Sequence, residues 1–304
     1  TAHPYRLQCE QWQLAEFLIE HIRTNLPNIE ILQGCRVEEC RQDDEGVEVF
    51  VTDSAGEKKT FSGDYLIGAD GSRSVVRSQL QLGFEGHTFP ETTVLATTSF
   101  PFHEHVPNLS FINYCWKESG NFSLLRLRDL WRVSLYPREN ESDQDATSPA
   151  SIESKLQEIF SKQTAYDVME IRPYRIHQRV VNSYVHGRMI LAGDAAHINS
   201  PSGGMGMNGG IHDAFNLADK LQRIYAGESK SLLGLYERQR RPIAVKHVLE
   251  QSGKNRARMQ ERDAGKRRQV LTELQRKATD KKLAEEYLLE TSMISGLREA
   301  ARIE

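Results

Sequence analysis

The sequence predicts an α/β fold that contains an inserted β-rich segment and ends in helices. Strand-like runs and helical patterns alternate in residues 1–83 and again in residues 186–226. β-forming residues dominate the segment between them, residues 84–185, and helical periodicity runs through residues 227–304. We therefore expect a discontinuous α/β domain, a β-rich domain inserted into it, and a helical C-terminal domain.

The composition is that of an ordinary globular protein. The chain has 304 residues, of which 27% are charged, and a net charge of −3, so neither disorder nor nucleic-acid binding is expected. No stretch approaches the roughly 18 apolar residues of a membrane span. Cys9, Cys35, Cys40 and Cys115 include no C-x-x-C pair, which argues against a metal ribbon or a disulfide framework and favours the cytoplasm.

The first α/β part begins with a helix. Leu14, Phe17, Leu18 and Ile22 recur at the spacing of one buried helix face, and Pro27 ends this helix. Strands are expected at residues 29–32, 47–51 and 65–69, with turns at residues 43–46 and 54–56. Because the helical pattern starts almost directly after Thr1, we expect the chain to be a fragment or to have a misplaced start.

The inserted segment consists mostly of strand-forming runs. Strands are expected at residues 92–99, 109–115, 122–127, 131–136 and 171–181, the last of them kinked at Pro173. Residues 140–151 are polar and predict a loop. Residues 151–163 predict a helix whose apolar side contains Ile152, Leu156, Ile159 and Phe160.

After the insert, a short apolar strand is expected at residues 189–193 and a helix at residues 207–225. The inner face of that helix is expected to contain Ile211, Phe215, Ala218 and Leu221. Farther on, residues 254–282 contain eleven Lys or Arg and four Asp or Glu, a net charge of +7. This segment is either a patch for an anionic partner or the solvated side of surface helices. We favour the second reading, with a buried stripe of Leu271, Leu274 and Ala278.

One motif joins a strand to a helix at residues 68–77. Asp70 ends the strand, where ligands bind in open α/β sheets, and its carboxylate would accept hydrogen bonds from ligand hydroxyls or nearby backbone N–H groups. Gly71 permits a tight turn, and Ser74 is placed to cap the helix. Arg77 would bind a phosphate or form an ion pair with Asp70. A ligand site and a purely structural turn are equally compatible with this motif.

A second motif runs from Gly193 to Leu217 and is richer in glycine. Asp194 again ends a strand, and Ala195 and Ala196 leave space against the backbone. Gly203, Gly204 and Gly206 expose backbone N–H groups directly before a helix. Because the N-terminus of a helix carries free donors and a partial positive charge, this arrangement favours a negatively charged ligand edge over a structural turn.

Three other chemistries are not supported. Gly204, Gly206 and Gly209 match G-x-G-x-x-G, but the preceding strand ends about ten residues earlier, so we predict no pyrophosphate loop there. Asp194 and His197 lack a third residue at a ligand spacing, so no metal site is predicted. The absence of G-x-S-x-G argues against an α/β-hydrolase.

The two motifs, about 120 residues apart and in this order, resemble those of the FAD-dependent aromatic hydroxylases, the p-hydroxybenzoate hydroxylase-like flavoprotein monooxygenases. Residues 236–242 are similar to the stretch that follows the second motif in that family, and the resemblance spans about residues 5–244. It implies that the α/β part is an FAD-binding Rossmann-like domain and that the β-rich insert covers the substrate. The family's N-terminal strand, G-x-G-x-x-G turn and helix, which hold the ADP half of FAD, do not occur before Thr1, so the resemblance implies an ADP-binding part that is incomplete.

By position, the resemblance assigns FAD contacts to Gln11 on the first helix, Val37 near the adenine, Asp194 on the ribityl chain and Pro201 beside the flavin ring. It places Asp70 and Arg77 near the pyrophosphate and the approaching nicotinamide. The whole set of implied cofactor-binding residues is Gln11, Val37, Asp70, Gly71, Arg77, Gly193, Asp194, Pro201, Gly204, Gly206, Met207 and Asn208. Catalytic side chains stay unassigned, because substrate contacts are not part of the shared motifs.

The implied reaction is hydroxylation of a phenolic or N-heteroaromatic compound. NADH or NADPH would reduce FAD, O₂ would form a flavin C4a-hydroperoxide, and one oxygen atom would pass to the ring. The alternatives are a non-hydroxylating flavoprotein of the same fold and a truncated, inactive fragment. The expected partners are therefore a small aromatic substrate and O₂, with no nucleic acid and no membrane span, and a homodimer is left open.

Overall fold

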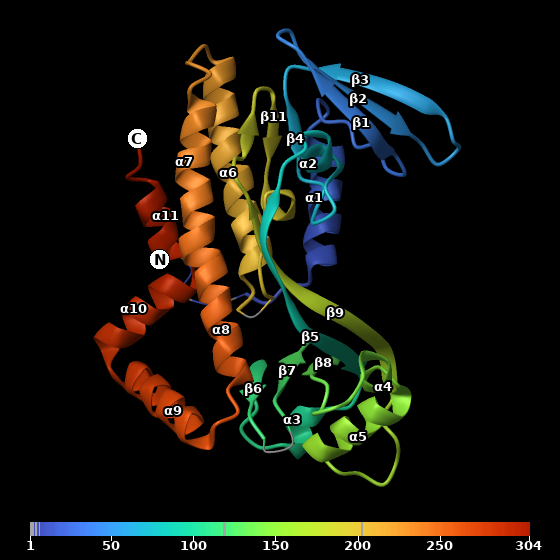
Figure 1. Cartoon of the computed structure of the whole chain (residues 1–304), viewed down its shortest axis with the longest axis vertical. Coiled ribbons are helices and arrows are strands. Elements are labelled where there is room, and N and C mark those ends of the chain that lie inside the picture. The colour runs from blue at the N-terminus through green and yellow to red at the C-terminus, as the bar shows by residue number, and fades with distance from the viewer. Residues whose placement is uncertain (1–2, 4, 6, 118–119, 202) are drawn as a thin grey trace. The chain divides into compact units, whose positions relative to one another are not determined.

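The computed structural model describes residues 3, 5, 7–117, 120–201 and 203–304 (Figure 1). The chain divides into two compact units, residues 1–63 and 64–304. Within the described residues, no helix has the length and apolar character needed to cross a membrane. Our division into three domains stays a prediction.

The first unit consists of one helix and a small sheet. Helix α1 covers Gln11–Asn25, and the strands are β1 (Arg36–Gln42), β2 (Val47–Thr52) and β3 (Lys58–Gly63). The strands pair antiparallel in the order β1-β2-β3. The predicted turn between β1 and β2 is confirmed, since the Asp43 carboxylate accepts hydrogen bonds from the backbone N–H groups of Glu45 and Gly46 at 2.8 and 2.9 Å.

Two predictions for this unit are wrong. No strand forms at residues 29–32, because the Ile29 N–H group bonds to the Leu26 carbonyl at 3.0 Å and closes a turn after the helix. The apolar face of α1 is not buried: Trp12, Phe17 and Leu18 are 56%, 64% and 47% exposed. Periodicity indicates which face of a helix is apolar, but burial also requires an opposing apolar layer, and the described residues supply none.

The second unit contains two sheets and most of the helices. Its first part comprises β4 (Leu66–Gly68), α2 (Val75–Gln79), β5 (Phe84–Thr98), α3 (Phe102–His105), β6 (Ile112–Cys115), β7 (Phe122–Arg126), β8 (Trp131–Leu135), α4 (Asp143–Ala146), α5 (Pro149–Ile159) and β9 (Val168–Val181). Its second part comprises β10 (Val185–His186), β11 (Met189–Leu191), η1 (Gly193–Ala195), β12 (His197–Ile198), α6 (Met205–Tyr225), α7 (Leu232–Ile243), a π-helical segment (Ala244–Leu249), α8 (Glu250–Gln260), α9 (Ala264–Thr279), α10 (Lys281–Thr291) and α11 (Ile294–Ala300).

The larger sheet contains the strands of the β-rich segment expected at residues 84–185 and, in addition, β12 from beyond it. Its six strands are ordered β12-β9-β5-β8-β7-β6, with β5 and β9 as a long antiparallel pair. The expected kink at Pro173 is wrong, because Pro173 pairs regularly with Val94. The pairing of β5 with β9 is irregular at two other places. One lies between Val168 and Glu170, and the other lies between Arg175 and His177, opposite the extra residues of β5 around Pro90, which lacks a backbone donor and therefore favours a bulge.

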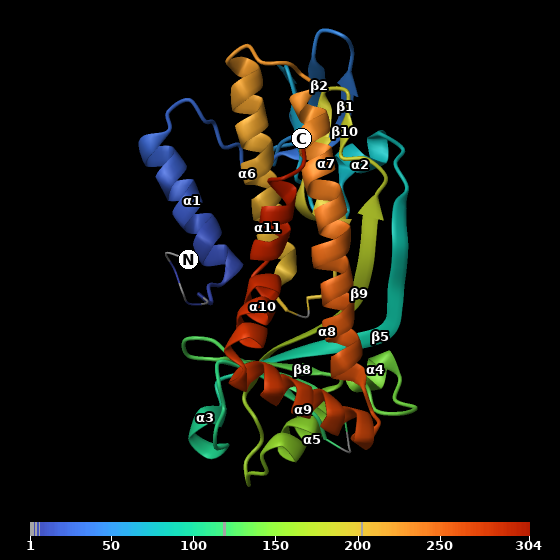
Figure 2. The same cartoon turned by 90° about the vertical axis from the view of Figure 1, so that its left-hand side faces the viewer.

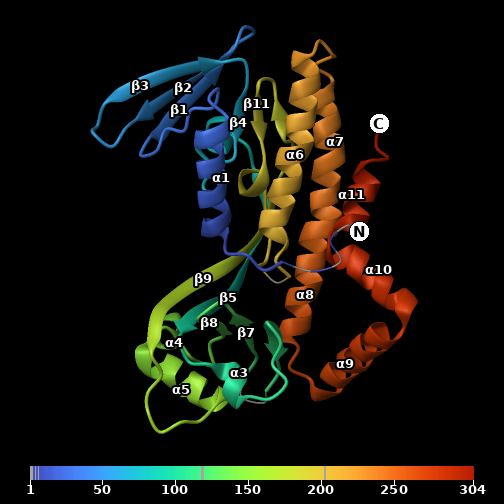
Figure 3. The same ribbon diagram turned by 180° about the vertical axis from the view of Figure 1, so that it is seen from behind.

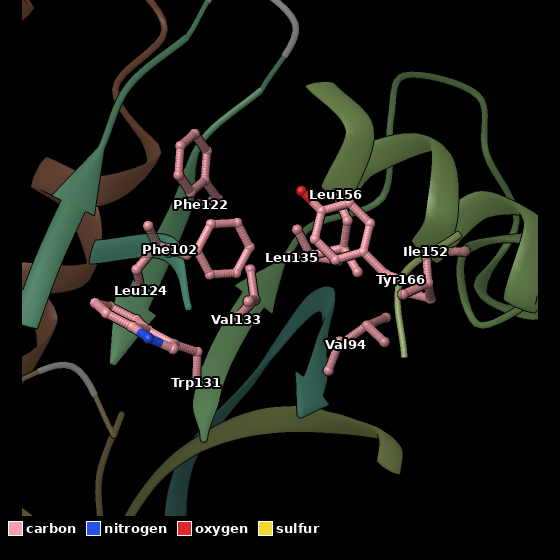
Figure 4. Packing of buried hydrophobic residues seen from close by; sticks show 12 residues of the cluster. Val94, Phe102, Phe122, Leu124, Trp131, Val133, Leu135, Ile152, Leu156 and Tyr166 are labelled. Atoms are coloured by element: carbon pink, nitrogen blue, oxygen red, sulfur yellow. The ribbon is translucent and has the colours of Figure 1, made fainter. Parts of the chain in front are cut away.

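One face of this sheet supports an apolar core with α5 (Figure 4). Val94 of β5 and Val133 of β8 are fully buried, as are Ile152 and Leu156 of α5, which confirms the inner side expected for that helix. The predicted loop at residues 140–151 is wrong in part. Two helices, α4 and α5, begin within it, because Ser142 and Ser148 cap their N-termini.

The smaller sheet has the order β10-β11-β4 and lies beside α6 (Figure 3). Strands β4 and β11 are far apart in the sequence but pair in parallel, with Leu191 opposite Gly68. Since the carboxyl ends of parallel strands meet at one edge, the two motifs that follow these strands are brought together.

The C-terminal part is helical, as predicted, and α7, the π-helical segment and α8 follow one another as one long rod (Figure 2). Two face predictions here are wrong. Phe215 is 75% exposed and Ala218 is exposed, because α6 buries Gly209, Asp213 and Leu217 instead. Helix α9 has no buried residue, and Leu271 of the expected stripe is 46% exposed.

Candidate cofactor-binding site

The two motif loops begin side by side, at the ends of β4 and β11. The Ala192 N–H group donates a hydrogen bond to the Gly68 carbonyl at 3.0 Å and extends the pairing by one residue. A Cβ atom on Gly68 would lie 2.8 Å from a methyl carbon of Leu191 and 2.9 Å from Cβ of Val76. Only glycine therefore permits this close approach of the strands and α2.

The first loop uses its acidic residue to cap a helix. The Asp70 Oδ2 atom accepts hydrogen bonds from the N–H groups of Val75 and Val76 at 2.6 and 3.2 Å. Ser74 Oγ accepts one from the Arg77 N–H group at 2.9 Å, so the predicted cap is confirmed. Gly71, with φ of 79°, makes the turn between them.

Arg77 connects the first loop to the second. Its guanidinium donates to the Ala195 carbonyl at 2.9 Å and to the Ser72 carbonyl at 2.7 Å, and it lies 4.0 Å from the centre of the Phe84 ring. Burial lowers the pKa of Arg77. It makes no ion pair with Asp70, so the ion-pair expectation is wrong: the Arg77 guanidinium binds one carbonyl of each loop, and the N–H groups at the start of α2 satisfy Asp70 instead.

The second loop presents an exposed carboxylate. Asp194 lies in the short 3₁₀ turn η1 after β11 and has no hydrogen-bond or ion-pair partner among the residues that the structure describes. Desolvation raises the pKa of Asp194, and the nearby His197 acts against that rise. Such a carboxylate is available to accept hydrogen bonds from the hydroxyls of a ligand.

A buried polar network holds this loop in place. The Asp213 carboxylate, fully buried on α6, accepts hydrogen bonds from the Gly193 N–H group at 3.0 Å, His197 Nε2 at 2.8 Å and Arg240 Nε at 2.7 Å. Burial alone would raise the pKa of Asp213, but these two side chains lower it below its usual value. The Asp213 carboxylate therefore connects three elements by hydrogen bonds: the second loop, α6 and α7.

The sequence motifs did not assign this network. Asp213 and His197 lie within the second motif, and Arg240 lies in the stretch that follows it, but their pairing depends on tertiary contacts. One signal was present: Gly209, Asp213 and Leu217 recur every four residues and share one helix face. The next residue, Gly210, also approaches the loop, and a Cβ on Gly210 would lie 3.2 Å from the Gly193 Cα atom.

The start of α6 supplies unpaired donors. Gly204 is its N-cap in the left-handed conformation, with φ of 67°, and no side chain caps the helix. The N–H groups of Gly206 and Met207 lie in the first turn and have no acceptor within the helix, whereas the Asn208 N–H group makes the first helical bond to the carbonyl of the N-cap Gly204 and is not free for a ligand. Together with the helix dipole, the two free N–H groups favour an anionic or carbonyl-rich ligand edge.

These features fit the donor and acceptor pattern of a flavin. A free carboxylate at Asp194 suits a polyhydroxyl chain, and the N–H groups at the start of α6 suit the oxygens of a pyrimidine ring. Pro201 is exposed in the loop between them. Gln11, the first residue of α1, and Val37 of β1 belong to the first unit, and their assigned contacts stay predictions, as does the role of Arg77 toward the nicotinamide.

The model of a family described as "FAD binding domain" matches residues 1–252. The chain belongs to this family. FAD is therefore its cofactor, and the predicted fold class and family resemblance are confirmed.

Relatives in this family are named as monooxygenases. The chain is 31% identical over 308 residues to para-nitrophenol 4-monooxygenase of Pseudomonas sp. (strain WBC-3), covering 98% of this chain and 74% of that protein. It is 33% identical to 6-hydroxy-3-succinoylpyridine 3-monooxygenase HspB of Pseudomonas putida (strain DSM 28022 / S16), covering 83% of this chain but only 64% of that protein.

The solved structures agree with this family. p-Nitrophenol 4-monooxygenase PnpA from Pseudomonas putida DLL-E4 superposes with a TM-score of 0.85 at 30% identity, covering 94% of this chain and 72% of that one. Aklavinone-11 hydroxylase, solved with FAD and aklavinone, gives a TM-score of 0.71 at 26% identity, with 78% of this chain and 45% of that one covered.

Proposed function

We propose that the protein is an FAD-dependent monooxygenase that hydroxylates a phenolic or N-heteroaromatic compound, with NADH or NADPH as reductant and O₂ as oxygen donor. The family assignment and the names of the relatives support the reaction class. The single structural observation that carries the proposal is the hydrogen bond from the Gly193 N–H group to Asp213 of α6. It holds the loop that carries the free Asp194 carboxylate against the helix whose N-terminus has no side-chain cap.

In this proposal the residues of the chain bind, orient and polarise the cofactor. Asp194 accepts hydrogen bonds from the ribityl hydroxyls, and the N–H groups of Gly206 and Met207 bind the oxygens of the pyrimidine edge. FAD, when bound, supplies the electron transfer and oxygen activation that no side chain provides. The dipole of α6 stabilises negative charge on the ring, because its donors are fixed before any charge develops.

The residues of the buried network fix the loop that carries Asp194. Asp213 holds the Gly193 N–H group at 3.0 Å and Arg77 holds the Ala195 carbonyl at 2.9 Å, so both sides of Asp194 are fixed. A preorganised loop loses less conformational entropy when the cofactor binds. We therefore assign Asp213 to positioning, and Arg77 positions the loop in addition to its predicted place near the pyrophosphate and the nicotinamide.

The experiment is reconstitution of the chain with FAD. Visible flavin absorption that survives desalting, and quenching of flavin fluorescence on titration, would show binding. The bound protein is then tested for NADH or NADPH oxidation that depends on an aromatic compound, with ¹⁸O₂ as oxygen source. One labelled oxygen in the product supports the proposal; aromatic-dependent turnover without label contradicts it.

One solved structure favours a second candidate function, that of a non-hydroxylating flavoprotein with the same fold. The protein described as Diels-Alderase PyrE3 superposes on this chain with a TM-score of 0.75 at 26% identity, covering 92% of this chain and 59% of that one. A non-hydroxylating flavoprotein would bind FAD through the same residues. It would retain flavin in the reconstitution but incorporate no oxygen from O₂.

A further inference from the structure

The second face of the six-stranded sheet carries polar side chains on β8, beside Leu125 of β7, where the first face is apolar. Trp131, Val133 and Leu135 of β8 point into the core with α5, so Arg132 and Ser134, which alternate with them, lie on the opposite face. Arg132 is opposite Thr97 of β5 on one side and opposite Leu125 of β7 on the other, which places it in the middle of the sheet.

Arg132 has no partner in the part of the chain that the structure describes. Its Nε atom is shielded from solvent and makes no hydrogen bond, and no carboxylate lies within ion-pair distance of its guanidinium. Arg172 on the same face differs, because it pairs with Glu170 at 2.5 Å. A partly buried guanidinium without a counter-charge is unfavourable, so this position favours an anion from outside the chain.

The polar face lies on the side of the cofactor loop. Helix α5 covers one side of the sheet, and the start of α6 lies on the other side in two perpendicular views (Figures 1 and 2). The sheet and the cofactor loop are also joined directly within the second unit. Strand β12 pairs with β9, with His197 opposite Val180, and the chain continues from β12 into the loop before α6.

The nearest acidic residue in the same row does not neutralise this site. Glu170, Thr97 and Arg132 follow one another across β9, β5 and β8, so Glu170 is two strands away from Arg132. Its Oε1 atom already accepts a hydrogen bond from Arg172. The local excess charge on this face is therefore positive at Arg132.

We propose that Arg132 binds an anionic oxygen of the aromatic substrate, a phenolate or a ring carboxylate. The inference rests on the proposed function and specifies the ionised form of the substrate. A guanidinium offers several N–H donors in one plane, which suits a flat aromatic anion held between the sheet and the flavin. Arg132 is thereby a substrate-binding residue of the β-rich segment, where the shared motifs assign none.

The test compares ligands that differ in charge but little in shape. The FAD-loaded protein is titrated with 4-nitrophenol, whose neutral and ionised forms differ in visible absorption, with its neutral methyl ether 4-nitroanisole, and with 4-nitrobenzoate. The variants are Arg132→Gln, Arg132→Lys and the matched control Arg172→Gln, which changes an arginine of the same face that already has a partner. Thermal melting and flavin retention check that each variant is folded.

The expected result is loss of anion binding only. Arg132→Gln should bind the anion about tenfold to a hundredfold more weakly, as for loss of a charge-assisted hydrogen bond, and the absorption of bound 4-nitrophenol should change from the ionised to the neutral form. Arg132→Lys should bind the anion several-fold more weakly than the wild type, since lysine retains the charge but not the planar donors. Arg172→Gln and all titrations with 4-nitroanisole should match the wild type. If Arg132→Gln loses affinity for 4-nitrophenol, Arg132 binds a phenolate. If it loses affinity for 4-nitrobenzoate alone, Arg132 binds a carboxylate.

Three outcomes would overturn the inference: unchanged anion binding in Arg132→Gln, equal losses for 4-nitroanisole, or no anion binding by the wild type. Its failure is distinct from failure of the proposed function. A wild type that hydroxylates phenols while Arg132→Gln retains anion affinity refutes the role of Arg132 alone. A wild type that binds the anion through Arg132 but incorporates no oxygen from O₂ refutes the proposed reaction alone.

Discussion

Substitution of Arg240 by methionine tests the buried network that holds the second loop. Arg240 is 1% exposed, and its Nε atom donates to the Asp213 carboxylate at 2.7 Å. Arg240→Met would leave this fully buried carboxylate with two donors, Gly193 N–H and His197 Nε2. Removing one partner of a buried ion pair costs about 3–5 kcal/mol, because a charge remains without compensation.

The magnitude can be measured as a melting temperature and by a double-mutant cycle. For a chain of this size, a destabilisation of that order lowers the Tm by roughly ten degrees. The double variant Asp213→Asn with Arg240→Met should be less destabilised than the sum of the single variants, with a coupling of about 1–3 kcal/mol, since the uncompensated charge is gone. FAD affinity of Arg240→Met should fall as well, because the loop that carries Asp194 loosens.

Two results would refute this reasoning. A Tm of Arg240→Met within about two degrees of the wild type would show that the buried pair contributes almost nothing. Strict additivity in the cycle would show that the two side chains do not interact energetically. Substitution of the exposed Arg298 by methionine serves as a control for loss of an arginine, and its Tm should stay unchanged.

Three further predictions concern stability and cofactor binding. Burial alone would raise the pKa of Glu141, but Lys155 and nearby hydrogen-bond donors lower it from 4.5 to about 2. The ionised Glu141 therefore stabilises the folded protein fully above about pH 4.5, and this contribution is lost as the pH falls toward 2. Glu141→Gln should therefore lower the Tm at pH 7 and converge with the wild type on acidification; a difference that does not depend on pH would contradict this. Leu156→Ala should cost about 2–5 kcal/mol in urea unfolding, since Leu156 is fully buried in the core of the β-rich segment, and a loss below 1 kcal/mol would show that the core relaxes. Asp194→Ala should weaken FAD binding at least tenfold in a fluorescence titration without a change in Tm, whereas Glu286→Ala on exposed α10 should affect neither, and equal FAD affinity in both variants would remove Asp194 from the site.

Much of the secondary structure could be predicted because local periodicity decides it. The strand at Val47–Thr52, the helix around Ile152 and Leu156, and the helix that begins at Met205 all follow from the spacing of apolar residues. Several of the errors concern which face of a helix is buried. Phe215 is exposed and Asp213 is buried on the same helix, because the packing surface of α6 is defined by Gly193, His197 and Arg240 of other elements.

The two acidic motif residues show the same division. The sequence placed both Asp70 and Asp194 at the ends of strands, and each does follow a strand of the smaller sheet. Their different roles depend on what faces them: Asp70 is occupied by the N–H groups of Val75 and Val76, and Asp194 has no partner among the described residues. A sequence pattern cannot show which carboxylate stays free.

The sequence by itself determined the class of fold, the positions of the two motifs and, through them, the family and its cofactor. Only the tertiary structure decided that Arg77 binds the Ala195 carbonyl, that Asp213 joins His197 to Arg240, and that Arg132 lies without a partner on the polar face of the sheet. The physical reason is the range of each interaction. Helices, turns and caps depend on neighbours within a few residues, whereas burial and charge pairing depend on elements that the fold brings together from distant parts of the chain.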